Sequence, residues 1–360
     1  MIWLLFPGIF LILVIWHFYF KKFWSKNVSV QLNFKEHYVY AGEQAHMTEQ
    51  IENRKRLPLP ATEIGFSISK YLVFQNMENA SISDYTYKQD IYALSGFQRI
   101  TRPMTIDCKK RGYYDVHEID CRAFTLFYKF FYSTQFKADT NLYVYAKRTN
   151  VNGITAACEQ MMSEQTCRRQ LYEDPFAFSS IREYAITDPM RAINWKASAK
   201  SGQLMVNTFE SILNPKLMIY LDLTDEGIYK LSYLVEEGIS IAATLAQKML
   251  RHGVETGIAV QDKLFKPATG QHQLTCIEEM LACLDISVAD VDFSLILSQP
   301  PRDCVSIVIS KNTSAKNQSA IEAFLKKYPG IWVLPEEKDT KIALTDCSNI
   351  QIIRREVARS

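Results

Sequence analysis

Cysteine is scarce in this sequence, and its spacing fits no common metal motif. Eight cysteines are scattered over 360 residues, and none forms a Cys-x-x-Cys pair. That is too few for a disulfide scaffold, so we expect free thiols in a reducing compartment. His272, Cys276 and Cys283 would share a helix face, but they fall one ligand short of a structural zinc site. We therefore expect both of these cysteines to be buried.

An excess of charge is also absent. Lys and Arg number 41 against 39 Asp and Glu, which gives a formal net charge of +2. A general nucleic-acid-binding protein normally shows a basic domain, so this balance argues against nucleic acid as a partner. Familiar catalytic motifs are missing too: there is no Walker loop, no dinucleotide-binding glycine fingerprint and no Gly-x-Ser-x-Gly. These absences argue against an enzyme.

The first twenty residues contain no Lys, Arg, Asp or Glu. A helix needs roughly 20 apolar residues to cross a bilayer, so residues 1–22 predict a transmembrane anchor. Lys21, Lys22 and Lys26 follow, and the positive-inside tendency would keep the bulk of the chain in the cytoplasm. A cleaved signal peptide is the alternative, but a basic leader and a small-residue cleavage site are missing. The sequence thus predicts a single-pass protein of the cell membrane.

The rest of the chain divides into three parts by its pattern. Residues 27–150 alternate polar and apolar residues between turn signals, which predicts an immunoglobulin-like β-sandwich. Residues 151–180 are polar and irregular, and we interpret residues 151–214 as a connecting segment. Residues 215–360 alternate apolar strands with amphipathic helices, which predicts a doubly wound α/β domain. The expected fold class is therefore α/β, with a transmembrane helix and a β-sandwich ahead of the α/β domain.

The connecting segment carries more ions than an ordinary core segment. Asp188 followed by Pro189 predicts the start of a short helix, and Gly202 predicts its end. Two interpretations of the charges around this helix stay open. In the first, the strand or loop that holds Arg182 and Glu183 pairs with Arg191 or Lys196 and latches the helix between the two domains. In the second, the charges form a recognition surface for an acidic partner, a phosphate or a nucleotide.

The stretch "REYAITDPMRAINWKASAKSGQLMVNTFE" resembles the signature of the bacterial domain-of-unknown-function family fifty-eight. The matching residues are Arg182, Glu183, Tyr184, Asp188, Arg191, Ile193, Trp195, Lys196, Ser198, Ala199 and Lys200. The family's glycine before the Asp is Thr187 here, and its usual terminal arginine is Lys200. Upstream, "KKRGYYDV" is similar to the family's Arg-Gly-Tyr strand entry.

The resemblance implies a role rather than an activity. Family members resemble von Willebrand factor type A proteins in their C-terminal part. They are often encoded beside MoxR-type AAA ATPases and transglutaminase-like membrane proteins. The implied role is a membrane-tethered partner of such an ATPase and of membrane proteins in the bilayer, without a cofactor.

A von Willebrand factor type A domain often binds Mg²⁺ through Asp-x-Ser-x-Ser after its first strand. Here Asp222, Thr224 and Glu226 stand at those positions, and their oxygens would suit Mg²⁺ or Ca²⁺ in an altered site. The later ligands of that fold cannot be placed, because the strand ending at Ser310 lacks the usual Asp-Gly. We therefore favour a site without metal, in which Asp222 caps a helix.

Two functional hypotheses follow. The first is a non-enzymatic adaptor, in which the signature residues Arg182, Asp188, Arg191, Trp195 and Lys196 fix a docking surface or its frame. The second is a metal-dependent hydrolase centred on Asp222 and Glu226, with Arg191 as the anion binder. The absence of a nucleophile–base pair in the sequence favours the adaptor.

Overall fold

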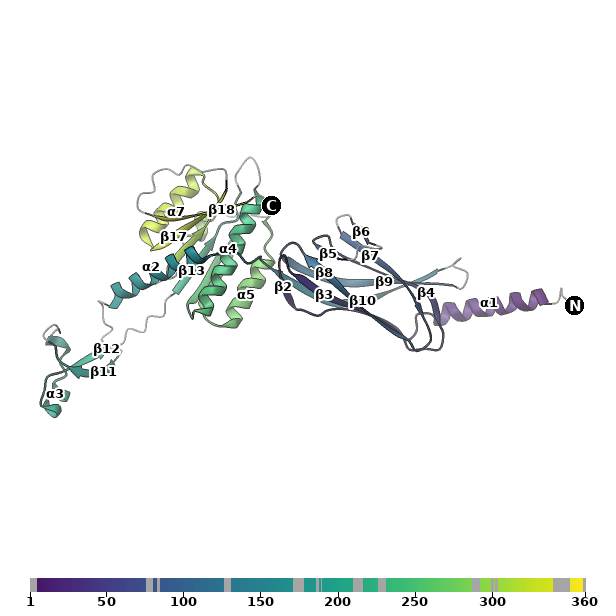
Figure 1. The fold of residues 1–360 in the computed structure, drawn as a ribbon, viewed down its shortest axis with the longest axis horizontal. Coiled ribbons are helices and arrows are strands. Elements are labelled where there is room, and N and C mark those ends of the chain that lie inside the picture. The colour runs from purple at the N-terminus through teal and green to yellow at the C-terminus, as the bar shows by residue number, and fades with distance from the viewer. Residues whose placement is uncertain are drawn as a thin grey trace. The chain divides into compact units, whose positions relative to one another are not determined.

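The computed structural model describes residues 5–75, 80–82, 85–125, 131–170, 178–185, 188, 190–209, 216–225, 231–286, 292–298, 301, 304–338 and 350–358. The chain forms two compact units (Figure 1). The first comprises Met1–Arg148 and Glu278–Leu284, and the second comprises Thr149–Ile277 and Asp285–Ser360.

Two packed sheets form the body of the first unit. One sheet has the order β1 (Val28–Phe34), β3 (Gln44–Asn53), β8 (Arg99–Cys108), β5 (Leu72–Phe74). The other has the order β2 (Tyr38–Tyr40), β10 (Phe131–Tyr145), β9 (Gly112–Phe124), β4 (Leu59–Ser69), β7 (Tyr85–Leu94), β6 (Ala80–Ile82). Apart from the parallel pair of β2 and β10, the described pairings in these sheets are antiparallel.

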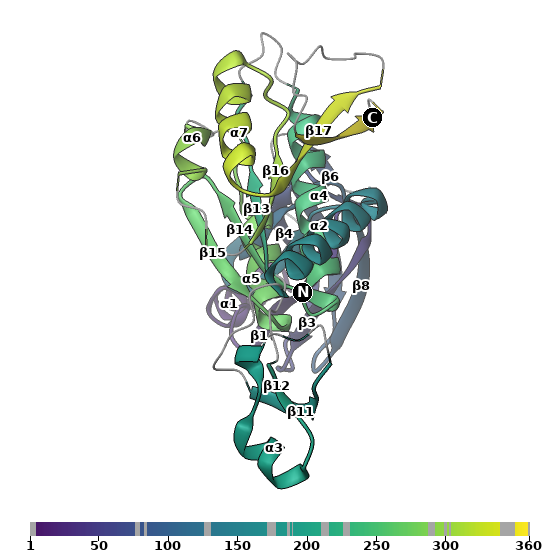
Figure 2. The same ribbon diagram turned by 90° about the vertical axis from the view of Figure 1, so that its left-hand side faces the viewer.

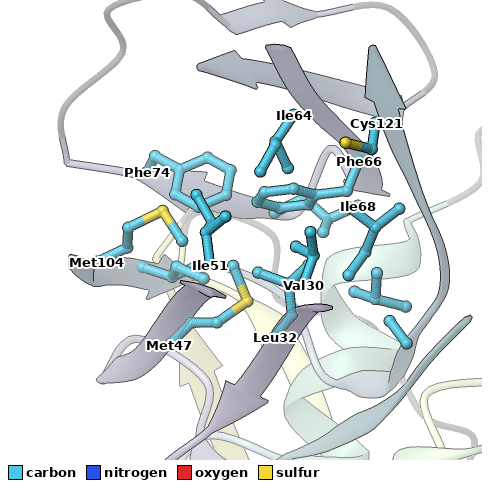
Figure 3. Close-up of a cluster of buried hydrophobic side chains, with 14 of the residues drawn as sticks. Val30, Leu32, Met47, Ile51, Ile64, Phe66, Ile68, Phe74, Met104 and Cys121 are labelled. Atoms are coloured by element: carbon cyan, nitrogen blue, oxygen red, sulfur yellow. The ribbon is translucent and has the colours of Figure 1, made fainter. Parts of the chain in front are cut away.

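Alternating side chains from both sheets meet in one hydrophobic core (Figure 3). In β1, for example, Val28, Val30 and Leu32 are buried while the residues between them are more exposed. Phe66 of β4 lies against Phe74 of β5, with ring centroids 6.1 Å apart. This is the two-layer packing that period-two alternation produces, because successive strand residues point to opposite faces.

The predicted transmembrane anchor is wrong. The first helix, α1 (Leu5–Phe23), ends on Lys21 and Lys22 before Phe23. Throughout the described part of the chain, no helix has both the length and the apolarity needed to cross a bilayer. Phe20 and Trp24, at the end of α1, are buried in the core of the β-sandwich, so this end of the helix packs on protein. The predicted single-pass membrane localisation depended on the anchor and is corrected with it.

A six-stranded sheet organises the second unit. Its order is β15 (Lys263–Ala268), β14 (Glu255–Val260), β13 (Lys216–Leu221), β16 (Val305–Ile309), β17 (Gly330–Glu337), β18 (Gln351–Val357). Only the β14–β15 pair among its described pairings is antiparallel. The parallel strands β13 and β16 are buried on both faces, which explains their nearly continuous apolar sequences.

Helices cover both faces of this sheet (Figure 2). On one side lie α4 (Ser232–Arg251) and α2 (Asn152–Gln170), where Gly238 of α4 allows close approach to Ile309. On the other side, α6 (Phe293–Ile296) and α7 (Ala315–Lys327) pack with Tyr220 and Trp332 in a second core. Helix α5 (Gln271–Ala282) begins in the second unit, and its last turn belongs to the first.

Helix α2 corrects the prediction of an irregular connecting segment. Most of its side chains are polar, so its pattern is weak in sequence. Ile154, Cys158 and Met162 nevertheless recur at four-residue steps and are buried. Three buried residues at this spacing lie on one helix face, which is enough to fix the helix on the α/β unit.

Candidate functional site

The signature residues fold into a small element that we call the signature hairpin, comprising the described residues between 178 and 209. Strand β11 (Phe178–Glu183) pairs antiparallel with β12 (Met205–Phe209). Between them lie a 3₁₀ turn, η2 (Met190–Ala192), and helix α3 (Trp195–Ser201). Ile193 forms a bridge to Val206, and both side chains are buried. The hairpin therefore has a local core of its own.

Arg182 and Asp188 close the turn after β11. Two guanidinium nitrogens of Arg182 donate to the two carboxylate oxygens of Asp188, at 2.7 and 2.6 Å. The backbone N–H of Ala185 also donates to this carboxylate, at 2.9 Å. These hydrogen bonds hold the pKa of Asp188 below its ordinary value, with the Arg182 bonds as the largest cause. Arg182, which the latch interpretation assigned to pairing with the helix, is thus bonded to the carboxylate of Asp188.

The helix begins later than its capping signals predicted. Asn194, not Asp188, is the N-cap: its side-chain oxygen accepts from the N–H of Ala197 at 3.0 Å. The Asn194 N–H also donates to the carbonyl of Met205 in β12, at 2.8 Å. The predicted end is confirmed, since Gly202 takes the left-handed conformation with φ of 74°.

Ser198 ties the helix to β12. Its side chain is buried, and its hydroxyl donates to the carbonyl of Asn194 at 2.8 Å. The same oxygen accepts from the N–H of Met205, at 2.8 Å. Ser198 is thus a structural member of the signature, because it satisfies backbone groups at both ends of the helix–strand turn.

Several other signature residues face outward. Met190 is 77% exposed and Trp195 is 68% exposed, although both are large apolar side chains. Basic and acidic residues of the signature are exposed as well, namely Arg191, Lys196, Lys200 and Glu183, whereas Tyr184 is half-buried. The hairpin therefore combines an internally bonded frame with exposed apolar and basic side chains.

The upstream Arg-Gly-Tyr stretch lies far from the signature in sequence and belongs to the first unit. Arg111 is buried, and one of its guanidinium nitrogens donates to three carbonyls at the end of α5. The acceptors are Leu281 at 2.7 Å, Ala282 at 3.2 Å and Leu284 at 2.9 Å. A cation at this position satisfies carbonyls that a helix end leaves unpaired and complements the helix dipole.

Asp222, the first residue of the predicted metal site, follows β13 and is buried. Its Oδ1 accepts from the N–H and the hydroxyl of Thr224, at 2.9 and 2.7 Å. Its Oδ2 accepts from Ser310 at 2.6 Å and from Asn317 at 3.1 Å. Burial raises the pKa of Asp222, while these donors act in the opposite direction. Glu226, the third predicted ligand, lies outside the described residues.

Ser310, Asn312 and Asn317 are site residues that the sequence did not identify. Asn312 donates to the Thr224 hydroxyl at 3.1 Å, and Asn317 also donates to Ser310 at 3.0 Å. Within the described residues, no group of three or more His, Cys, Asp or Glu side chains is arranged so that it could hold a metal ion. The sequence signal that could have identified Ser310 is its position at the end of a parallel strand, since the carboxyl ends of such strands share one sheet edge.

The six cysteines that the structure describes are free thiols, as expected. The predicted burial of Cys276 and Cys283 was wrong: Cys276 is half-buried and Cys283 is exposed. His272 lies one turn before Cys276, with a ring nitrogen 3.7 Å from the sulfur. The face that these residues share is turned partly to solvent rather than to the core.

Comparison with known protein families gives a match, which covers most of the signature hairpin and most of the α/β region. Residues 180–339 match the family described as "Protein of unknown function DUF58". The "Uncharacterized protein YeaD" of Bacillus subtilis (strain 168) is 30% identical over 81 residues, which are 22% of this chain. That match spans only 19% of the Bacillus protein.

Solved structures give weaker likenesses. The CARDB domain of PF1109 from Pyrococcus furiosus is 12% identical, with a TM-score of 0.21 over 32% of this chain and 93% of that domain. A non-cellulosomal cohesin from Archaeoglobus fulgidus is 9% identical, with a TM-score of 0.22 over 36% of this chain and 97% of the cohesin. The family match supports the resemblance to DUF58 over residues 180–339, and the Bacillus relative adds support for it.

Proposed function

We propose that this protein is an adaptor without catalysis of its own, and that the signature hairpin is its docking element for a protein partner. The main support for this proposal is that Met190 and Trp195 are exposed on an element that internal hydrogen bonds hold together. Contiguous exposed apolar patches mark protein–protein interaction sites. Tryptophan is also among the residues that dominate binding energy at protein interfaces.

The charges around these side chains favour an acidic partner. Arg191, Lys196 and Lys200 are exposed within the same short segment, whereas the charge of Arg182 is matched internally by Asp188. Basic groups at the rim of an apolar contact accelerate association with an acidic surface and reject basic surfaces. A protein surface with an apolar pocket and acidic rim therefore fits the hairpin best.

The partner that we propose is a MoxR-type AAA ATPase, which the family resemblance implies. The internal frame supports this role, because a docking element that is already ordered loses little conformational entropy on binding. The half-buried Tyr184, whose N–H donates to the Leu204 carbonyl at 2.9 Å, belongs to that frame.

A binding titration of the full chain with the purified MoxR-type ATPase of the same organism tests the proposal. Trp195→Ala should weaken the Kd by about 30-fold, as expected for loss of an interface residue that contributes about 2 kcal/mol. Leu295→Ala is the matched control, because Leu295 is 66% exposed on α6 and should leave the Kd unchanged. Raising the salt concentration should weaken binding of the wild-type chain.

Two outcomes would contradict this assignment. Absence of binding by the wild-type chain at the highest soluble concentration would remove the ATPase as partner. Equal affinities for the wild-type chain and the Trp195→Ala variant would show that binding occurs away from the signature hairpin.

A further inference from the structure

The two loops that follow β13 and β16 meet at the carboxyl ends of these neighbouring strands of the α/β sheet. Strand β13 has β14 on one side and β16 on the other, so the connections leave it in opposite directions. In open α/β sheets, the crevice beyond the carboxyl ends of such a strand pair is the usual ligand site. Here that crevice is crossed by side-chain contacts.

Three consecutive residues after β16 each contact a different residue of the loop after β13. Ser310 donates to Asp222 at 2.6 Å, Lys311 pairs with Asp225 at 2.5 Å, and Asn312 donates to Thr224 at 3.1 Å. Each of these three residues therefore has a partner on the facing loop. We call these six residues the loop clasp.

The members of the clasp are well shielded from solvent. Asp222, Ser310 and Asn312 are buried, and the side chain of Lys311 is only 7% exposed. The carbonyl of Ser310 also accepts from the indole N–H of Trp332, at 3.2 Å, on the neighbouring strand β17. Shielding of this kind makes an ion pair and its hydrogen bonds geometrically fixed rather than interchangeable with water.

The hydrogen-bonding capacity of Asp222 is fully used. A carboxylate has about four lone-pair positions, and four donor groups lie on its two oxygens: two from Thr224, one from Ser310 and one from Asn317. A divalent cation such as Mg²⁺ needs several oxygen ligands with lone pairs directed at it. The donor groups occupy those positions, so Asp222 in this arrangement does not fit a metal ligand.

The carboxylate of Asp225 does not fit a metal ligand either, because of the charge beside it. Asp225 is paired with the ammonium of Lys311, which also lies 3.4 Å from the carbonyl of Leu231. A divalent cation bound to Asp225 would have to displace this ammonium or accept its repulsion. The residues present therefore disagree with the Mg²⁺ site that the von Willebrand factor type A resemblance implies.

We infer that the loop clasp is a metal-independent lock, in which the ammonium of Lys311 supplies the positive charge that a divalent cation supplies in a metal-binding sheet of this type. The lock joins the ends of β13 and β16 and closes the crevice at which such sheets bind ligands. It assigns these residues to holding the α/β unit together rather than to hydrolysis.

Thermal unfolding and calorimetric titration of the full chain test the lock. The wild-type melting temperature should be the same in EDTA and in excess Mg²⁺ or Ca²⁺, and titration with either ion should give no binding heat. Lys311→Met should lower the melting temperature by roughly 5 °C or more under all three conditions, because it leaves a shielded carboxylate unpaired. Lys316→Met is the control, since Lys316 forms an exposed ion pair with Asp292 at 2.6 Å.

A wild-type melting temperature that rises with either ion would overturn the inference, as would a binding heat that Asp222→Asn abolishes. Either result would favour the hydrolase hypothesis centred on Asp222. A Lys311→Met variant that melts with the wild type would also overturn it. The wild-type measurements decide the matter even where a variant does not fold, and they are independent of ATPase binding.

Discussion

Arg182 lies against Asp188 with both ends of its guanidinium engaged, at 2.7 and 2.6 Å from the two carboxylate oxygens. The same carboxylate accepts the N–H of Ala185. One acidic residue thus fixes both a side chain and the backbone of the turn. The charges of the signature therefore divide into a pair used internally and the exposed residues Glu183, Arg191, Lys196 and Lys200.

The turn at Asp188 should open only in acid. The Arg182 bonds and the Ala185 bond lower the pKa of Asp188 below its ordinary 3.8, so the stabilisation is present above that pH. It should be lost as the pH falls through the lower pKa of the folded state. An NMR titration of the Ala185 amide should show this midpoint, and Asp188→Asn should remove it. A midpoint at or above 3.8 would contradict the pairing.

Ser198→Ala should loosen the helix of the signature hairpin. The substitution removes the acceptor for the Met205 N–H, which lies 2.8 Å from the hydroxyl, and the expected loss is about 1–3 kcal/mol. Hydrogen exchange at the Met205 amide should accelerate accordingly. Ser201→Ala is the control, because Ser201 is exposed and bonds only around the helix end. Equal exchange in the two variants would show that the buried hydroxyl does not hold β12.

Arg111→Met should destabilise the end of α5. The change removes a shielded donor from the carbonyls of Leu281, Ala282 and Leu284, at an expected cost of about 1–3 kcal/mol. Urea unfolding and amide exchange in the last turn of α5 measure the effect. Lys109→Met changes an exposed cation two positions away and should be nearly neutral. The interpretation fails if the two substitutions have the same effect.

Glu49→Gln should stabilise the first unit increasingly as the pH rises. Glu49 is completely buried, and its carboxylate accepts from the Tyr92 hydroxyl at 2.7 Å. Burial raises the pKa of Glu49, and Asp90 raises it further, while the Tyr92 hydrogen bond and the charges of Arg102 and Lys88 act in the opposite direction. A raised pKa gives full stability below the ordinary value of 4.5, and this stability is lost as the pH rises through the folded-state pKa.

Glutamine does not ionise and can still accept the Tyr92 bond, so it avoids that loss. Unfolding of wild type and variant at pH 4 and pH 7 should therefore show a difference that grows with pH. A difference that is constant over this range would mean that Glu49 does not titrate with folding.

The local sequence pattern was sufficient to predict the strands that are half-buried or fully buried. The alternation through Val28, Val30 and Leu32 predicted β1, and the unbroken apolar run before Asp222 predicted the buried strand β13. Both patterns follow directly from which strand faces are buried, so neighbours far along the chain need not be known.

The sequence signals for a helix start and for a membrane anchor were less reliable, because the same residues fit more than one structure. Asp188 and Asn194 are both good N-caps. The Asn194 N–H pairs with Met205 of β12, and the helix begins after Asn194. The apolar residues of α1 resembled a membrane span, but Phe20 and Trp24 pack into the β-sandwich instead. In each case a contact remote in sequence overrides a local preference.

The sequence by itself determined the strand and helix patterns, the signature and the position of Asp222 at a strand end. Only the tertiary structure decided that Asp222 receives Ser310 and Asn317, that Lys311 pairs with Asp225, and that Trp195 faces solvent. The physical reason is that hydrogen-bond partners and exposure depend on distance in space. Strand β13 ends at Leu221 and β16 begins at Val305, so their adjacency in the sheet is set by the crossover of the chain rather than by local pattern.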